Sequence, residues 1–205
     1  SHEIIMLNTQ LKIFAFLSVC QLFIITHSAA NEIRIAVASN FYPTMKAIVE
    51  EFKLENYESS KINKIVLISG SSGKHYAQIM NGAPFDIFFS ADQVRPILLE
   101  EKGIVEYESR FTYALGKIVL WSPTNGLVDS EGQVLYDNNF RFLAIANPKI
   151  APYGIATKET LISMGLWNNM SKKVVRGENI AQAFQFIHSG NAELGFVSLS
   201  QLMSP

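Results

Sequence analysis

Four short polar segments carry the residues with the most evident chemistry. They are ASN (38–40), SGSSGK (69–74), APYG (151–154) and GEN (177–179). Each follows an apolar, β-prone run and precedes a helix-like one, so each is expected at the carboxyl end of a strand, where α/β sheets bind ligands. Serine hydroxyls and the free N–H groups of helix N-termini would be the donors there, and donors of this kind suit an anion.

The Gly73-Lys74 pair suggests a P-loop, but the spacing excludes it. A P-loop needs a glycine five residues before Gly-Lys and a serine or threonine after it. Here those positions hold Ile68 and His75. Two interpretations stay open for the hydroxyls of Ser71 and Ser72, namely anion binding and ordinary helix capping.

Acid–base and metal chemistry have weaker support. Asp86 or Asp92 could act as a general base with His75 in an enzyme, but no nucleophile or metal set accompanies them, and a structural role is favoured. His75 and His188 have no second histidine, cysteine or carboxylate at ligand spacing, which argues against zinc. No catalytic residue is therefore predicted.

Composition sets the class of the protein. The 205 residues are 48% hydrophobic and 17% charged, with a formal net charge of −1. This is enough apolar material for a globular core, and it gives no basic footprint for nucleic acid.

The first 30 residues have the pattern of a secretory signal peptide. Lys12 precedes an apolar run of 13 residues (13–25), and Ser28 and Ala30 occupy the −3 and −1 positions of a cleavage site. Met6 is the expected start of the protein, and residues 1–5 ahead of it are expected to be a remnant of the gene model. The run is short for a membrane span of about 20 residues. We expect a periplasmic protein that starts at Asn31, and lipid attachment at Cys20 is not favoured because Val19 fits poorly before it.

Alternating strand and helix patterns predict a parallel α/β fold. Strands are expected at 32–38, 64–69, 85–91, 142–148, 172–177 and 193–200. Helices are expected at about 42–54, from near Gly73 to Met80, at 93–101, from the APYG turn to about Met164, and at 181–190. The β-prone segment 110–122, interrupted by Gly116, is expected to cross from one lobe to another. The organisation predicted is lobe 1 at 31–115 and the crossover with lobe 2 at 116–205, with a cleft between the lobes.

Several sequence segments resemble the corresponding segments of the periplasmic molybdate-binding proteins of ABC importers. They are AVASNF (36–41), SGSSGKHYAQI (69–79), GAPFDIFFSAD (82–92), YALGKIVLWS (113–122), AIANPKIAPYGIATKE (144–159), GLW (165–167), GEN with AQA (177–183) and GNAELGFVSLSQ (190–201). The resemblance covers about residues 33–201.

This resemblance implies a two-lobed type II periplasmic-binding-protein fold, linked by a hinge, that closes on molybdate or tungstate. It implies that Ser39 and Ser72 bind the oxygens through hydroxyl and main-chain N–H groups, and that the N–H groups of Tyr153 and Ile180 complete the shell. Molybdenum would be held only as the oxyanion. The expected protein is a monomer without cofactor that delivers its ligand to an ABC permease.

The chain departs from the family in two places. Ser198 stands where some members have a tyrosine ligand, so it is a possible additional ligand along with Ser71, Asn40 and Asn179. Family members continue for about 40 residues beyond the strand that matches GFVS, so the C-terminal part is expected to be truncated. The open alternatives are another oxyanion such as sulfate or chromate, a periplasmic enzyme, and the sensing domain of a regulator.

Overall fold

The computed structural model describes residues 32–55 and 64–203. The predicted signal peptide, its cleavage site and Cys20 lie outside these residues. The described chain contains two β-sheets, one built before residue 90 and one after residue 117. The α/β prediction is confirmed, and all pairs of strands are parallel except one.

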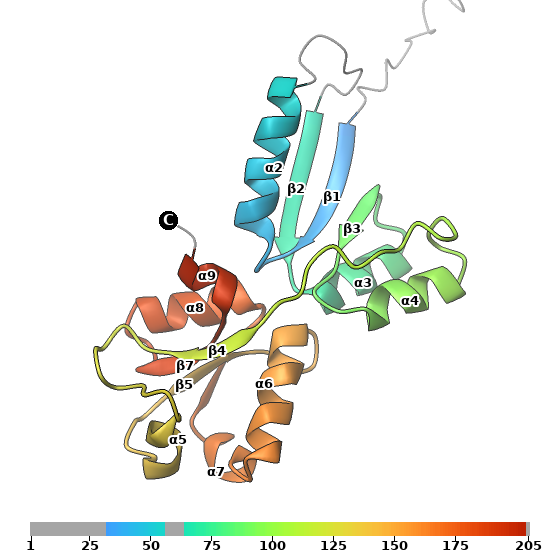
Figure 1. Ribbon diagram of the computed structural model, residues 1–205. Helices are drawn as coiled ribbons and strands as arrows, with labels where there is room; N and C mark the ends of the chain where they lie inside the picture. The colour runs from blue at the N-terminus through green and yellow to red at the C-terminus, as the bar shows by residue number, and fades with distance from the viewer. Residues whose placement is uncertain (1–31, 56–63, 204–205) are drawn as a thin grey trace, which may run out of the picture. The chain divides into compact units, whose positions relative to one another are not determined.

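The first sheet has the strand order β2-β1-β3. Its elements are β1 (Glu32–Ala38), α2 (Tyr42–Glu55), β2 (Lys64–Gly70), α3 (Ser72–Met80), β3 (Ile87–Phe89) and α4 (Val94–Glu101). Central strand β1 pairs with β2 over its whole length, from Glu32 with Lys64 to Ala38 with Gly70. Helix α2 lies along β1 and β2 (Figure 1), where Met45 and Val49 meet Ile35 and Val37 in a small core. The register brings the ends of β1 and β2, and the loops that follow them, to one edge.

The second sheet has the order β4-β7-β5-β6. Its elements are β4 (Ile118–Trp121), α5 (Gln133–Asp137), β5 (Leu143–Ala146), α6 (Pro152–Ser163), α7 (Trp167–Met170), β6 (Val174–Gly177), α8 (Ile180–His188), β7 (Leu194–Ser198) and α9 (Leu199–Met203). Strands β5 and β7 are buried at every position, as expected for inner strands covered on both faces. Helices α6 and α8 lie beside this sheet (Figure 1) and start at the ends of β5 and β6.

Three predicted segments differ from the structure. The strand predicted at 110–122 is realised only as β4, whose residues pair antiparallel with β7. The strand predicted at 85–91 is shortened to β3, and the one predicted at 193–200 stops at Ser198, where α9 begins. Strand propensity marks these segments, but only residues with a pairing partner form a ladder.

Within the described ranges, no helix is long and apolar enough to cross a membrane.

Candidate functional site

The four polar segments meet at one small cavity, which we call the serine cavity. It is lined by Ala38, Ser39, Asn40, Gly70, Ser71, Ser72, Ala91, Ala151, Pro152, Tyr153, Asn179 and Ile180. The first sheet supplies the walls up to Ala91, and the second sheet supplies the rest. The cavity measures about 10 Å³, close to the space that one water molecule requires. A larger guest therefore requires the walls to separate.

Ser39 lies at the end of β1 and is 6% exposed. Its main-chain N–H donates to the carbonyl of Gly70 at 2.9 Å, which ties the β1 loop to the β2 loop. The main-chain donor of Ser39 is therefore already used, and its hydroxyl is the group left for the cavity. Ser39 Oγ accepts a long hydrogen bond of 3.4 Å from the N–H of Ala181 on α8.

Of the two serines, Ser71 takes the capping role that the sequence left open, and Ser72 does not. Ser71 is the N-cap of α3, and its Oγ accepts from the N–H of Lys74. Ser72 is the first residue of the helix, so its own N–H has no acceptor within α3. Ser72 Oγ accepts from the N–H of Ala91 at 2.9 Å. That bond occupies an oxygen lone pair and leaves the hydroxyl proton for a further acceptor.

Tyr153 is the second residue of α6, directly after Pro152. Proline at the first helical position has no N–H, so Tyr153 provides the first main-chain donor of this helix. Helix α6 comes very close to the end of β5, because a Cβ on Gly154 would lie 2.3 Å from the carbonyl oxygen of Ala146. Only glycine permits this approach, and it sets the start of α6 against the cavity.

Asn40 links the two sheets through its amide. Asn40 Nδ2 donates to Tyr153 Oη at 3.3 Å, while Asn40 Oδ1 is buried with no hydrogen-bond partner. Rotating the amide by 180° would let Oδ1 accept from the tyrosine hydroxyl and turn the NH₂ group to where Oδ1 lies now. In that orientation the tyrosine hydroxyl has an acceptor, and the NH₂ group of Asn40 is a spare donor.

Ile180 begins α8 as its first helical residue, 3% exposed. Asn179 caps the helix, since its side chain accepts from the N–H of Gln182 at 3.0 Å. The N–H of Ile180, like that of Ser72, has no acceptor within its helix. Helices α3, α6 and α8 thus all begin at the wall of the serine cavity, and the positive ends of their dipoles favour an anion there.

Ser198 does not line the serine cavity. It is fully buried at the end of β7, where its hydroxyl contacts Ser200 Oγ and Gln201 Oε1, each at 3.0 Å. Gln201 in turn donates from Nε2 to the carbonyl of Ile180 at 3.3 Å. Ser198 is therefore connected to the start of α8 through Gln201.

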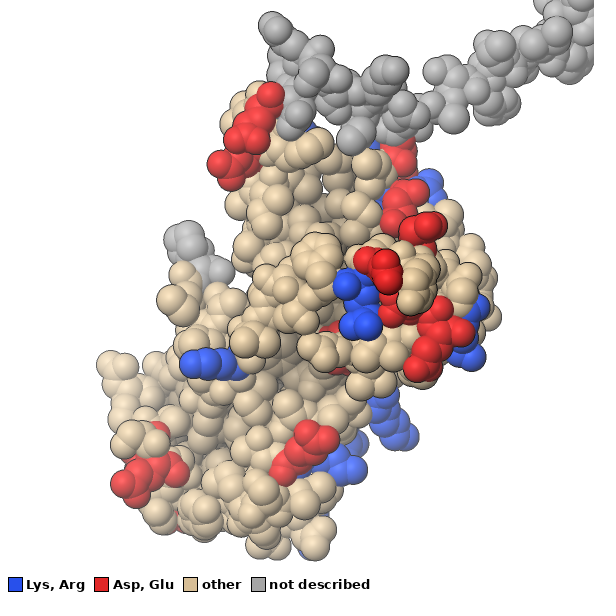
Figure 2. Space-filling model, turned by 45° about the vertical axis from the view of Figure 1, so that its right-hand side comes forward, with Lys and Arg blue, Asp and Glu red and all other residues tan. Residues whose placement is uncertain are grey.

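The lining of the serine cavity contains no acidic or basic side chain. Burial raises the pKa of Tyr153, and burial together with nearby Tyr153 raises the pKa of Tyr113 to about 12. Both phenols are therefore neutral at physiological pH and add no negative charge. On the face shown in Figure 2, basic and acidic side chains are interspersed, without a gathered basic patch. The polar groups of the cavity are therefore all uncharged.

The candidate catalytic and metal residues are not brought together. Asp86 accepts from the N–H of Arg34 at 2.7 Å, and Asp92 forms an ion pair with Arg95 in the first turn of α4. His75 is buried elsewhere, with Nε2 on the carbonyl of Val37 at 3.2 Å and Nδ1 on Gln78. No group of histidine, cysteine and carboxylate side chains within 32–55 and 64–203 could hold a metal ion.

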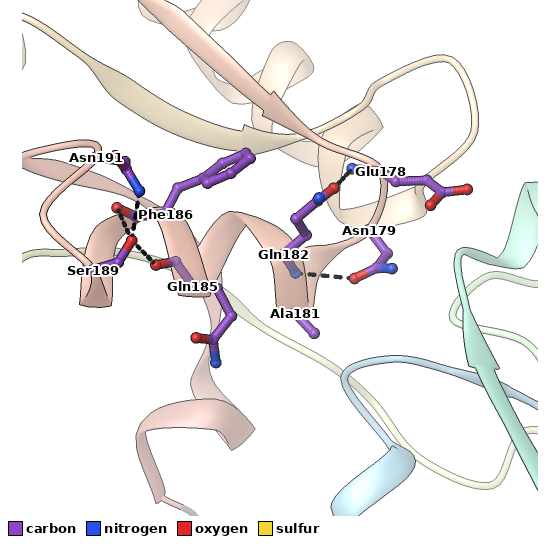
Figure 3. A pocket seen from close by; sticks show the side chains of 8 residues that line it. All are labelled: Glu178, Asn179, Ala181, Gln182, Gln185, Phe186, Ser189 and Asn191. Atoms are coloured by element: carbon purple, nitrogen blue, oxygen red, sulfur yellow. Dashed lines mark hydrogen bonds between the residues drawn. The ribbon is translucent and has the colours of Figure 1, made fainter.

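A second, open hollow lies along the outer side of α8 (Figure 3), lined by Glu178, Asn179, Ala181, Gln182, Gln185, Phe186, Ser189 and Asn191. Its polar groups largely bond one another. Asn179 Oδ1 accepts from Gln182 N, Gln182 Oε1 accepts from Glu178 N, and Asn191 Nδ2 donates to Ser189 Oγ. No group of donors converges on a common point, so this hollow has weaker binding chemistry than the serine cavity.

Sequence reasoning missed three groups near the serine cavity. Ala91 follows β3 at the same sheet edge, so the strand-end rule could have found it. The Asn40–Tyr153 contact joins residues 113 positions apart, and Gln201 lies in a helix of five residues. No pattern in the neighbouring sequence predicts the Asn40–Tyr153 contact or the position of Gln201.

Comparisons with known proteins show the family of this chain. Residues 33–205 match the family described as "Bacterial extracellular solute-binding protein". The chain is 49% identical over 173 residues to the Molybdate-binding protein ModA of Azotobacter vinelandii, which covers 84% of this chain and 67% of that protein. It is 41% identical over 176 residues to ModA of Rhodobacter capsulatus, covering 86% and 68% of the two chains.

A solved structure shares the fold. The periplasmic molybdate-binding protein of Azotobacter vinelandii superposes with a TM-score of 0.77 at 43% identity, over 82% of this chain and 71% of that one. The predicted fold class and family resemblance are thereby confirmed. The close homologues are substrate-binding proteins and not enzymes.

Proposed function

This chain belongs to the family of bacterial extracellular solute-binding proteins, and on that premise we propose that it captures molybdate or tungstate in the serine cavity. The observation that carries the proposal is the convergence of two serine hydroxyls and three helix N-termini on one uncharged cavity. A tetrahedral dianion can accept all of these hydrogen bonds, and bonds to a charged acceptor are about twice as strong as neutral ones.

The proposed ligand shell has four residues. Ser39 donates its hydroxyl, Ser72 donates its hydroxyl and its N–H, and Tyr153 and Ile180 donate main-chain N–H groups. Asn40 is a further donor if its amide turns toward the anion. Ser71 and Asn179 act through the caps that they form, which hold the first turns of α3 and α8 in place.

Binding is proposed to involve closure of two lobes. The cavity of about 10 Å³ is walled by loops from both sheets, so an oxyanion enters only when the loops part, and it then favours the arrangement in which both sets of donors reach it. A ligand shifts such an equilibrium only by its greater affinity for the closed arrangement. The division into lobes at 31–115 and 116–205 is part of this proposal.

The proposed setting is the periplasm, with export by the predicted signal peptide and delivery of the oxyanion to an ABC permease by a monomeric carrier. The names of the homologues support the ligand, and a solved homologue is described as periplasmic.

The competing ligand is another oxyanion, such as sulfate or chromate. Size separates sulfate from molybdate if the closed cavity has fixed walls. A protonated anion such as hydrogen phosphate would place its own donor against the donors of the cavity, and an unpaired buried donor costs about 1–3 kcal/mol.

Isothermal titration of the purified protein with molybdate, tungstate, chromate, sulfate and phosphate tests the proposal. We expect one-to-one binding of molybdate and tungstate, with no heat from sulfate or phosphate. Ser39→Ala combined with Ser72→Ala should weaken molybdate binding at least about a hundredfold, since each lost bond to a charged group is worth about 1.5–3 kcal/mol.

Ser69→Ala is the matched control, because Ser69 is an exposed serine in β2, three residues before Ser72. It should leave the affinity unchanged. A folded wild-type protein that binds sulfate as tightly as molybdate, or a double variant that binds like wild type, would overturn the proposal.

A further inference from the structure

A chain of hydrogen bonds runs from the end of β7 to the wall of the serine cavity. Ser198 donates from both its N–H and its hydroxyl to Gln201 Oε1, each at 3.0 Å. Gln201 Nε2 donates to the carbonyl of Ile180 at 3.3 Å. The N–H of the next residue, Ala181, points at Ser39 Oγ at 3.4 Å.

The last two contacts lie at opposite ends of one peptide group. The Ile180 carbonyl and the Ala181 N–H belong to the same planar unit, which rotates as a whole. The helical geometry of α8 already orients this peptide, and a further donor on the carbonyl oxygen restricts the direction of the N–H more tightly. It also polarises the group and strengthens the N–H as a donor, because hydrogen bonds in a chain reinforce one another.

The side chain at 201 needs both an acceptor and a donor to make these contacts. A glutamine amide has one acceptor and one donor group. The two donors of Ser198, a residue with no exposed surface, occupy the acceptor and fix which way the amide turns. The donor is then left facing the carbonyl of Ile180. The contacts of Ser198 thus set the orientation of the Gln201 amide.

We infer that Gln201 is a positioning residue of the binding site: it orients the Ile180–Ala181 peptide so that the Ala181 N–H faces Ser39 and the anion bound there. The affinity part of this inference rests on the proposed function. Gln201 itself does not line the serine cavity.

The first test replaces Gln201 by methionine, which keeps the length of the side chain and removes both hydrogen-bonding groups. We expect molybdate affinity to fall about three- to tenfold, the effect of one hydrogen bond of roughly 0.5–1.5 kcal/mol. Gln185→Met is the matched control, since Gln185 projects from the exposed side of α8 (Figure 3). The control should bind like wild type. Equal affinities for Gln201→Met and wild type would overturn the inference.

The second test separates positioning of the peptide from mere anchoring of α9. In Gln201→Glu the carboxylate still accepts from Ser198, but it has no donor for the carbonyl of Ile180. A protonated carboxyl has both groups. The affinity of Gln201→Glu relative to wild type should therefore rise as the pH falls through the pKa of the new carboxyl, while Gln201→Met shows no such recovery. Wild-type affinity of Gln201→Glu at neutral pH would mean that only anchoring matters.

The third test needs no ligand. The amide proton of Ala181 in the NMR spectrum should shift upfield in Gln201→Met, because its donor strength falls, and should keep its position in Gln185→Met. An unchanged Ala181 amide would overturn the inference. If wild type binds none of the oxyanions, the proposed function fails, and the Ala181 amide still decides the role of Gln201.

Discussion

The two sheets that line the serine cavity differ in the size of the apolar core that packs against them. Among the described residues before 117, the buried hydrophobic ones are Ile35, Ala36, Val37, Ala38, Met45, Val49 and Leu99. After it, β5 and β7 are buried throughout and join a core of ten buried residues with α6 and α7 around them. Among the groups proposed as ligands, Ser39 and Ser72 therefore belong to the sheet with the smaller apolar core.

This contrast indicates which part of the structure can change its conformation more easily. Regions with few buried apolar contacts open at lower free energy than well-packed cores. We call residues 32–101 the first region and residues 118–203 the second region. We expect the second region to keep its conformation when an anion enters the cavity, and the first region to change its conformation.

The largest effect should come from matched core truncations. Ile145 on β5 has no exposed surface, whereas Ile65 on edge strand β2 is only partly buried. Ile145→Ala should lower the free energy of unfolding by about 3–4 kcal/mol, within the usual cost of a buried isoleucine, and Ile65→Ala by about 1 kcal/mol. Urea unfolding followed by circular dichroism measures both. Equal losses would refute the contrast in burial.

Two glycine substitutions test the same contrast in the backbone. Gly154→Ala puts a Cβ 2.3 Å from the Ala146 carbonyl, inside the second region. Although alanine favours a helix by about 1 kcal/mol, we expect a net loss of roughly 2 kcal/mol because the packed backbone cannot retreat.

In Gly73→Ala the added Cβ contacts a residue of the other region. Its Cβ would lie 2.4 Å from the carbonyl of Ile150, so the contact joins the first region to the second. The regions can part slightly, so stability should fall by less than in Gly154→Ala, whereas molybdate affinity should fall about tenfold because the closed arrangement is lost. Thermal unfolding and titration of both variants give the two numbers. A Gly73→Ala protein that binds normally would show that this contact has no part in closure.

A buried histidine should give the first region a pH dependence of its own. Burial lowers the pKa of His75 below its ordinary value, and nearby Lys74 adds to the effect. The unfolded chain then binds a proton more readily than the folded one. Stability is fully present above about pH 6.5 and falls as the pH decreases from there to the lowered pKa.

Urea unfolding of wild type, His75→Gln and His188→Gln between about pH 7.5 and 5 measures this. His75→Gln should flatten the stability profile in that window, and His188→Gln should not, since the His188 side chain is exposed. A wild-type profile that is already flat would contradict the expectation.

Much of this arrangement could be predicted from local sequence. The β-branched runs located β1, β2, β5, β6 and β7 to within a few residues, because a buried strand must be apolar. The rule that the carboxyl ends of parallel strands share an edge brought together the two polar segments of each sheet. The predicted cleft between two lobes then brought the two pairs face to face.

What escaped prediction depended on partners distant in sequence. Residues 110–117 have strand propensity but no assigned strand, and Phe111 and Leu115 are exposed there. Helices α5, α7 and α9 are four or five residues long, too short for a helical period to show. Contacts such as Gln201 to Ile180 exist only once α8 and α9 have packed together, so no local sequence pattern predicts them.

The smallest effect, and the last test of the comparison, concerns the ion pair that joins the two regions at the surface. Lys74 Nζ lies 2.8 Å from Glu178 Oε1, and both side chains are about half exposed (48% each). Solvent screening limits such a pair to about 0–1 kcal/mol. Two roles differ in sign: an ion pair that favours closure makes both Lys74→Met and Glu178→Gln weaken molybdate binding slightly, whereas steering of the anion by charge makes Lys74→Met weaken it and Glu178→Gln strengthen it.

We expect the first outcome, with each variant binding less than about threefold more weakly at low salt and like wild type at high salt. The double variant should then bind no worse than either single variant, because the partners act as one contact. Titration at two salt concentrations decides the matter. Opposite signs for the two single variants would assign Lys74 to the approach of the anion and leave the closing of the two regions to the backbone contact at Gly73 and the Asn40–Tyr153 hydrogen bond.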